Sequence, residues 1–145
     1  MAVQTSAGTT LGIATGSPAT FDSTGYNALT YTVVGEITDL GEFGKEFNLV
    51  THIPLGNRQV KKFKGSFNNG SLQLQLGRDT ANVGQIALRT ALASDASFSF
   101  RVTLQDATKL YFTGKVMSYK TSVGSVDQIT GAMTAIEIDS EIVEV

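Results

Sequence analysis

An alternation of polar and apolar residues runs through the stretch Ser97-Phe98-Ser99-Phe100-Arg101-Val102-Thr103-Leu104. Side chains along a β-strand point to opposite faces in turn, so this pattern is typical of a strand with one buried and one exposed face. A polar turn from Gln105 to Lys109 follows, and a second strand is expected from Leu110 to Tyr119. The two strands together predict a β-hairpin.

The same period of two recurs on both sides of this hairpin. Leu72, Leu74 and Leu76 alternate with polar residues after the dipeptide Asn69-Gly70, which favours a tight type I′ hairpin turn. Further strands are expected near residues 31–38, 43–49, 59–67 and 129–143, with Phe63 and Phe67 facing the core. About seven strands result, which predicts a mainly β fold: an antiparallel β-sandwich or barrel-forming sheets with one flanking helix.

The flanking helix is expected over about residues 80–94, with Asp79 or Thr80 as its N-cap. Its polar residues form one narrow stripe, and apolar residues such as Leu88 and Leu92 cover most of the remaining circumference. An ordinary surface helix is apolar only on the side that faces the core. We therefore expect the helix to pack on its own sheet and also to be covered by another subunit.

Composition excludes several classes of function. The chain has 145 residues, enough for one domain, with a net charge of −2, no Cys and one His. Disulfides and cysteine-based zinc sites are excluded, and the total charge gives no support to a generic nucleic-acid binder. No secretion signal and no apolar run of the roughly 18 residues that a membrane helix needs are visible. The chain is therefore expected to stay in the cytoplasm, without a membrane partner, until something else moves it.

No constellation of residues points to chemistry. His52 stands beside Pro54 in an expected loop, with no acid or nucleophile at a recognisable spacing. The aspartates fall mostly at expected turns and at a helix start, where their side chains bond nearby backbone N–H groups. No phosphate-binding loop, EF-hand or dinucleotide fingerprint is present. We predict no catalytic residue, metal site or cofactor, and no enzyme activity.

Charge is distributed in two clusters. The basic cluster contains Arg58, Lys61, Lys62 and Lys64, and the acidic cluster near the C-terminus contains Glu137, Asp139, Glu141 and Glu144. The basic residues are open to two other interpretations, a contact to phosphate or a solvated strand face. Opposite patches on one subunit favour head-to-tail self-association, in which the positive patch of one copy meets the negative patch of the next.

Residues 1–30 differ in character from the rest of the chain, because apolar residues are scattered in a background rich in Thr, Ser, Gly and Ala. We interpret this segment as an extended N-terminal arm that docks on a neighbour through Phe21, Tyr26 and Leu29, and the alternative is a frayed tail. Residues 31–145 are then a single β domain.

Several segments resemble tail tube proteins (major tail proteins) of bacteriophages with long non-contractile tails. The resemblance depends on order and spacing from about residue 20 to residue 145 rather than on one diagnostic motif. The segments are Thr20-Phe21-Asp22-Ser23-Thr24-Gly25-Tyr26, Leu29-Thr30-Tyr31, Val34-Gly35-Glu36-Ile37, Glu46-Phe47-Asn48, Lys64-Gly65-Ser66 and Asp79-Thr80-Ala81-Asn82-Val83-Gly84-Gln85.

The resemblance implies a structural virion protein. Family members form hexameric rings that stack into a hollow tube, each subunit adding strands to one barrel, and DNA passes through the lumen as non-specific cargo. It implies further contacts with the tape measure, tail terminator and distal tail proteins, assembly in the host cytoplasm and a final location in the virion tail. Ring stacking would use residues 1–30 and the stretch 41–64, which contains Phe43. Two alternatives remain: a tail terminator or related ring protein of a contractile tail or secretion machine, and a β-sandwich binding module.

Overall fold

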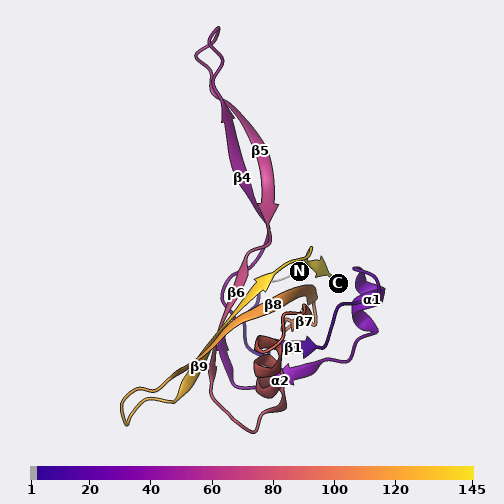
Figure 1. The fold of residues 1–145 in the computed structure, drawn as a ribbon, viewed down its shortest axis with the longest axis vertical. Helices are drawn as coiled ribbons and strands as arrows, with labels where there is room; N and C mark the ends of the chain where they lie inside the picture. The colour runs from indigo at the N-terminus through magenta and orange to yellow at the C-terminus, as the bar shows by residue number, and fades with distance from the viewer. Residues whose placement is uncertain (1–2) are drawn as a thin grey trace.

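The computed structural model describes residues 3–145, which form ten strands and two short helices. The strands are β1 Thr10–Ala14, β2 Thr32–Val34, β3 Ile37–Asp39, β4 Glu46–His52, β5 Lys61–Asn68, β6 Ser71–Gly77, β7 Phe98–Thr103, β8 Lys109–Ser122, β9 Gly131–Ile138 and β10 Val143–Glu144. The helices are α1 Ser23–Asn27 and α2 Val83–Leu92. The body carries one long projecting hairpin, β4–β5 (Figure 1).

Eight strands form one antiparallel sheet, in the order β2-β1-β7-β8-β9-β6-β3, with β10 also paired to β8. The 14-residue strand β8 is the longest, and it pairs with β7 along its first half and with β9 along its second half. Only Gly35 and Glu36 connect β2 to β3, the two ends of this path. The two ends must therefore lie close together, and the sheet curls around its own apolar face.

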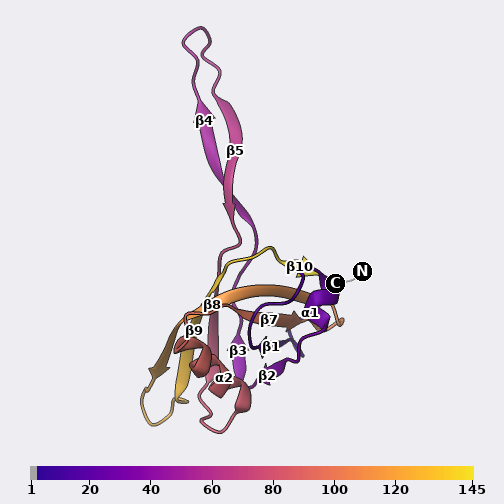
Figure 2. The ribbon, with the colours of Figure 1, turned by 45° about the vertical axis from the view of Figure 1, so that its right-hand side comes forward.

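The core fills the inside of the curled sheet. Its members come from nearly every strand of the large sheet and from α2, which packs across the opening (Figure 2). The largest fully buried apolar side chains in it are Leu11, Leu72, Leu74, Leu88, Phe100, Phe112 and Ile136. Burial of such side chains contributes about 1.5–3 kcal/mol each, so the body folds around its own core.

The predicted fold class is confirmed: the protein is mainly β with antiparallel sheets. The hairpin expected from the alternating stretch is β7–β8, in which Thr103 pairs with Lys109 across the turn. Phe98, Phe100 and Val102 are buried, as their period of two requires. The total is larger than expected for three reasons: β1 was not expected, the strand expected near residues 31–38 is divided into β2 and β3, and the strand expected near residues 129–143 is divided into β9 and β10.

The predicted helix is shorter than expected. α2 begins at Val83 and ends at Leu92, and its N-cap is Asn82, whose side chain accepts a hydrogen bond from the N–H of Gln85. Asp79 instead closes a local turn by accepting from the N–H of Ala81 at 3.0 Å. Asn, Asp and Thr are all good N-caps, so the composition alone did not distinguish between the candidates.

The interpretation of residues 1–30 as an extended arm is corrected for much of that segment. Residues 10–14 form β1, an internal strand of the sheet that pairs with β2 on one side and with β7 on the other. Leu11 and Ile13 lie in the core, and Tyr26 in α1 is fully buried. A five-residue strand flanked by Thr and Gly is too short for its period to stand out in the sequence, which is why it was missed.

The turn expected at Asn69-Gly70 is also different from the prediction. β5 and β6 do not pair with each other; β5 pairs with β4 in a separate two-stranded sheet, and β6 pairs with β9 and β3. Gly70 does adopt the positive φ, +85°, for which the dipeptide is suited. The chain uses this conformation to pass from the projecting hairpin back into the body, and the stretch 41–64 contains β4, the hairpin tip and the first half of β5.

A buried side chain, Gln85, holds the seam between the two ends of the sheet. Its Nε2 donates to the carbonyl oxygens of Gly35 at 3.1 Å and Gly77 at 2.9 Å. Its Oε1 accepts from the backbone N–H of Asp79 at 2.9 Å and from the hydroxyl of Tyr119 at 3.2 Å. All four hydrogen-bonding sites of the amide are therefore used, which is what burial of a polar group requires.

We expect the substitution Gln85→Met to destabilise the fold by about 3 kcal/mol, because it keeps the length of the side chain but leaves buried backbone groups without partners. Urea unfolding followed by circular dichroism measures the free energy of unfolding. The matched control is Gln73→Met on the exposed face of β6, which should change that free energy by less than about 0.5 kcal/mol. Equal effects of the two substitutions would show that the seam does not depend on this amide.

Candidate assembly surfaces

The β4–β5 hairpin exposes apolar side chains on both of its faces. Phe47 pairs with Phe67 and Val50 pairs with Phe63, but a shift in register between Phe47 and Leu49 places the two pairs on opposite faces. Phe63 is 53% exposed and Leu49 is 66% exposed. The expectation that Phe63 and Phe67 face the core is therefore wrong. A two-stranded ribbon is marginally stable alone, and exposed apolar surface of this kind marks an interaction site.

The base of the hairpin is held by an aromatic and lysine cluster. The rings of Phe47 and Phe67 lie 5.4 Å apart, with the ammonium of Lys45 4.3 Å from the Phe67 ring and that of Lys64 4.8 Å from the Phe47 ring. Lys45 also forms a 2.9 Å salt bridge with Glu141. Of these contacts, only the salt bridge with Glu141 reaches outside the hairpin segment, and both of its side chains are partly exposed.

The predicted basic and acidic clusters lie in different parts of the molecule. Arg58 lies in the loop at the tip of the hairpin, and Lys61 and Lys62 begin β5 next to it. Of the acidic residues, Glu137 is exposed on β9, whereas Asp139 and Glu141 already form salt bridges within the chain. The two clusters do not meet inside one copy, because the hairpin points away from the body (Figures 1 and 2).

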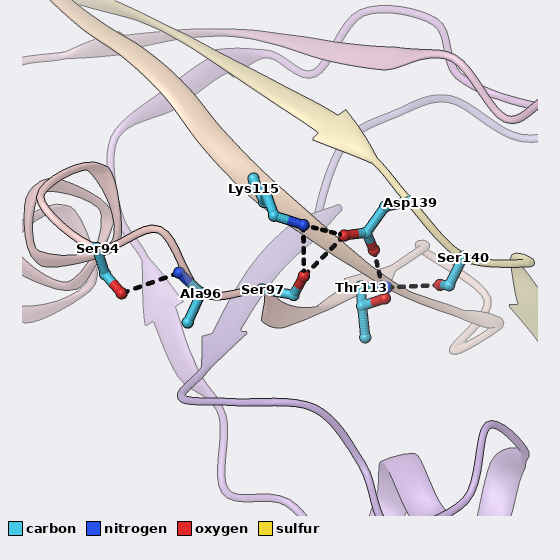
Figure 3. Close-up of polar contacts among 7 residues, drawn as sticks. All are labelled: Ser94, Ala96, Ser97, Thr113, Lys115, Asp139 and Ser140. Atoms are coloured by element: carbon cyan, nitrogen blue, oxygen red, sulfur yellow. Dashed lines mark hydrogen bonds and ion pairs between the residues drawn. The ribbon is translucent and has the colours of Figure 1, made fainter.

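Asp139 is the centre of a polar network that ties the end of β9 to β7 and β8 (Figure 3). Its Oδ2 accepts from the Lys115 ammonium at 2.8 Å and from the Ser97 hydroxyl at 2.7 Å. Its Oδ1 accepts from the Thr113 hydroxyl at 2.8 Å. Ser140 accepts from the backbone N–H of Thr113 at 2.9 Å and extends the network to the next residue.

A serine beside a lysine also occurs in some hydrolases, where the lysine takes the proton of the serine hydroxyl. Here the Ser97 hydroxyl donates to Asp139, and Lys115 donates to Ser97 at 3.0 Å as the counter-ion of the same carboxylate. Partial burial acts to raise the pKa of Asp139, but hydrogen bonds from Lys115, Ser97 and Thr113 outweigh it, and the pKa is lowered. This arrangement suits a network that holds neighbouring strands together, rather than activation of the serine hydroxyl.

Helix α2 turns a second apolar face away from the core. Leu88 is fully buried inside the chain, so this candidate assembly residue does not lie on the surface. Val83 is 65% exposed and Ile86 is 44% exposed, and Leu92 is partly exposed on the same helix. The helix thus has apolar residues on the side that faces the core and also on the side that faces solvent, as expected.

The remaining candidate residues lie in α1 and its flanks and at the foot of the hairpin. Tyr26 is buried and stacks on Tyr111 at 5.3 Å, while Phe21 stays exposed with its ring 6.3 Å from that of Tyr26. Leu29 is half-buried near the end of α1. Phe43 lies at the foot of the hairpin and packs against Phe112 at 5.8 Å. Phe21 is therefore the most accessible of this group.

Two strands of the large sheet, β3 and β8, have an unpaired edge, and these two edges border one part of the sheet on its two sides. Consecutive strands β8, β9, β6 and β3 form this layer. Among the described residues, β3 pairs only with β6, and the stretch of β8 from Lys115 to Ser122 pairs only with β9. Unpaired edges present free N–H and C=O groups that can bind another strand.

Sequence reasoning missed the most exposed apolar residues of the hairpin as candidates for an assembly surface: Leu49, Ile53 and Leu55. A signal was present, since apolar residues occupy both alternating positions between residues 47 and 55, and neither face of such a strand is polar. Within residues 3–145, no group of three potential metal ligands is brought together. No helix in this part of the chain is long and apolar enough to cross a membrane.

No family model matches the sequence, and no curated protein is similar to it in sequence. The fold is similar to that of a chain in the six-fold symmetrised cryo-EM structure of the anti-feeding prophage baseplate, with a TM-score of 0.75 at 10% identity, over 100% of this chain and 97% of that one. It is also similar to the SPP1 tail tube, with a TM-score of 0.63 at 10% identity, over 94% of this chain and 75% of that one. At such low identity, these likenesses establish the fold.

We expect Asp139→Asn to lower the free energy of unfolding at pH 7 by about 0.5–1 kcal/mol, a value reduced by solvent screening of the pair. A lowered pKa in the folded state contributes stability at higher pH, and this contribution is lost as the pH falls below the ordinary value of 3.8 and through the folded-state pKa. The difference between the native chain and the variant should therefore shrink in acid.

Urea unfolding at a series of pH values between about 7 and 2 measures this effect, since it spans the ordinary carboxyl range. Asp127→Asn, in the exposed loop after β8, is the matched control and should leave the profile unchanged. A constant difference between the native chain and Asp139→Asn across this range would contradict the role assigned to the carboxylate.

Proposed function

We propose that this chain is a structural subunit of a bacteriophage tail or a related tail-type particle, and that it assembles with copies of itself into stacked rings that form a hollow tube. The observation that carries this proposal is the layer β8-β9-β6-β3 with an unpaired edge at each side. If β3 of one copy pairs with β8 of the next, the free N–H and C=O groups of both strands form hydrogen bonds. A row of such copies still has one free edge at each end, and only closure into a ring pairs these two edges.

The similar folds support a ring of six copies. The baseplate structure is six-fold symmetrised. Six copies with four strands each would supply about 24 strands, which exceeds the 16–18 strands that already enclose an aqueous channel in porins. Tail-type assemblies are common to both similar structures, one a tail tube and the other a baseplate.

The outer face of the four-stranded layer is suited to line the channel. Gln73 and Gln75 on β6 and Met133 on β9 are exposed there, together with the ion pair of Lys115 and Asp139. The same face also carries the exposed side chains of Glu137 and Lys120, so its positive and negative charges are equal in number and it offers no excess of positive charge to phosphate groups. A strongly basic bore would bind DNA tightly through counterion release, so this surface favours passage of DNA as non-specific cargo.

The other two exposed apolar surfaces have complementary roles in this proposal. The outer face of α2 packs against the neighbour within a ring, and the β4–β5 hairpin reaches toward another ring. The tape measure, tail terminator and distal tail proteins are the further partners of such a tube, which is built in the host cytoplasm and becomes part of the virion tail.

A second candidate function is a ring protein of a baseplate or of a contractile or secretion machine. The specific observation in its favour is that the match to the baseplate chain spans 97% of that chain, against 75% for the tail tube chain. The two functions differ in polymer form. Negative-stain electron microscopy of concentrated protein distinguishes tubes of indefinite length from single rings, and a strictly monomeric protein would contradict both.

We expect Ile86→Asp to prevent ring formation while the monomer stays folded, because this exposed side chain on α2 would place a charge in an apolar contact. Val123→Asp, which also puts a charge at an exposed apolar position but lies in the loop after β8, is the matched control and should assemble normally. Electron microscopy and analytical ultracentrifugation measure assembly, and circular dichroism checks the fold. If both variants assemble like the native chain, the helix is not part of the interface.

We expect shortening of the hairpin to separate ring formation from stacking. Replacing residues 48–66 by Asn-Gly keeps the Phe47 and Phe67 pair next to a tight turn and leaves the large sheet intact. The product should have a melting temperature close to that of the native chain and should form rings but no tubes under the microscope. Long tubes from the shortened chain would remove the hairpin from the stacking contact.

A further inference from the structure

An open hollow of about 430 Å³ lies at the foot of the β4–β5 hairpin. Its wall is apolar, formed by Phe43, Leu110 and Ile142, and its rim carries the carboxylates of Glu141 and Glu144. Glu141 is paired with Lys45, which also lines the hollow, whereas Glu144 forms no salt bridge among the described residues. The hollow therefore combines apolar surface with one negative charge that is not neutralised within the chain.

The tip of the hairpin carries the matching groups. Leu55 is fully exposed, with Ile53 two-thirds exposed beside it. Arg58 is the only charged residue between residues 53 and 60. A guanidinium has five N–H donors and no acceptor, and its planar shape allows it to bind a carboxylate through two hydrogen bonds.

We propose that the hairpin tip of one copy docks in the hollow at the hairpin foot of the next copy, with Leu55 against the apolar wall and Arg58 near Glu144. The inference rests on the proposed function, because it requires that copies of this chain associate. It also identifies Glu144 as the acidic partner of the basic tip, in place of Asp139, whose carboxylate is occupied by Lys115, Ser97 and Thr113.

The hairpin cannot fill its own hollow, because its tip points away from the body (Figures 1 and 2). Ten residues separate Lys45 at the foot from Leu55 at the tip. At the rise of an extended strand, this separation corresponds to about 33 Å. Docking of tip to foot therefore relates two copies by a shift of about that length along the hairpin, and the same contact repeats from copy to copy without limit.

A disulfide test follows from the composition, since the chain has no cysteine of its own. The double variant Leu55→Cys with Ile142→Cys should form disulfides between copies under mild oxidation, because its two positions meet only across the proposed contact. A non-reducing gel of assembled protein should show a ladder of covalent multimers. The matched control combines Leu55→Cys with Val123→Cys, which lies in the exposed loop after β8, and should give no ladder.

Charge reversal gives an independent test. Arg58→Glu should raise the protein concentration required for tube formation about tenfold or more, because it removes one partner of a charged pair and adds repulsion. Adding Glu144→Arg should restore assembly, whereas adding Asp127→Arg should not. Rescue by Asp127→Arg to the same degree would overturn the docking.

The outcomes separate this inference from the proposed function. Native tubes under the microscope with no ladder from the Leu55 and Ile142 pair would overturn the docking and leave the tube subunit standing. A ladder from the Leu55 and Val123 pair would place the tip elsewhere on the next copy and likewise overturn it. Absence of any assembly of the native chain would overturn both.

Discussion

The hydrogen bonds of Gln85 are the constraint on which the rest of the structure depends. A sheet with β2 and β3 at its two ends could open at the seam, because only Gly35 and Glu36 connect those strands. Gln85 bridges the seam by donating to Gly35 and Gly77, and α2 carries it there, covering the core at the same time. Closure of the seam fixes the position of β3, and the free edge of β3 becomes available for a neighbour only in that position.

The sequence predicted the parts of this fold in which a single period extends over many residues. Leu72, Leu74, Leu76, Phe98, Phe100 and Val102 are buried as their alternation requires, and the predicted helix is present with Leu88 in the core. β1 could not be predicted in the same way, because its partners β2 and β7 are distant in the chain and supply the contacts that make Leu11 and Ile13 a strand. Gln85 has no local signal at all, since its partners come from three separate segments.

The candidate surfaces show the same difference between features with a local sequence signal and features that depend on contacts between distant segments. The basic residues of the hairpin follow from the sequence, but the register shift next to Phe47 places Phe63 on the face opposite to Phe67. No simple alternation predicts such a shift. Asp139 was expected on an open acidic patch and instead lies in a network with Lys115, Ser97 and Thr113, because strands that are remote in sequence meet there. Charge clusters in a sequence identify candidates, and tertiary contacts decide which of them remain available.

The position of β1 has a consequence for the synthesis of the subunit. β1 ends at residue 14, and its partner β7 begins at residue 98, so the inner strand of the sheet waits for most of the chain to leave the ribosome. Long-range strand pairing of this kind folds late, because the entropy of closing the intervening loop must be overcome before any contact forms. The local β7–β8 and β8–β9 hairpins can form first and provide the surface on which β1 docks. A chain built in this order has a complete sheet only after translation has passed the core strands, so the unpaired edges of β3 and β8 reach their final positions late.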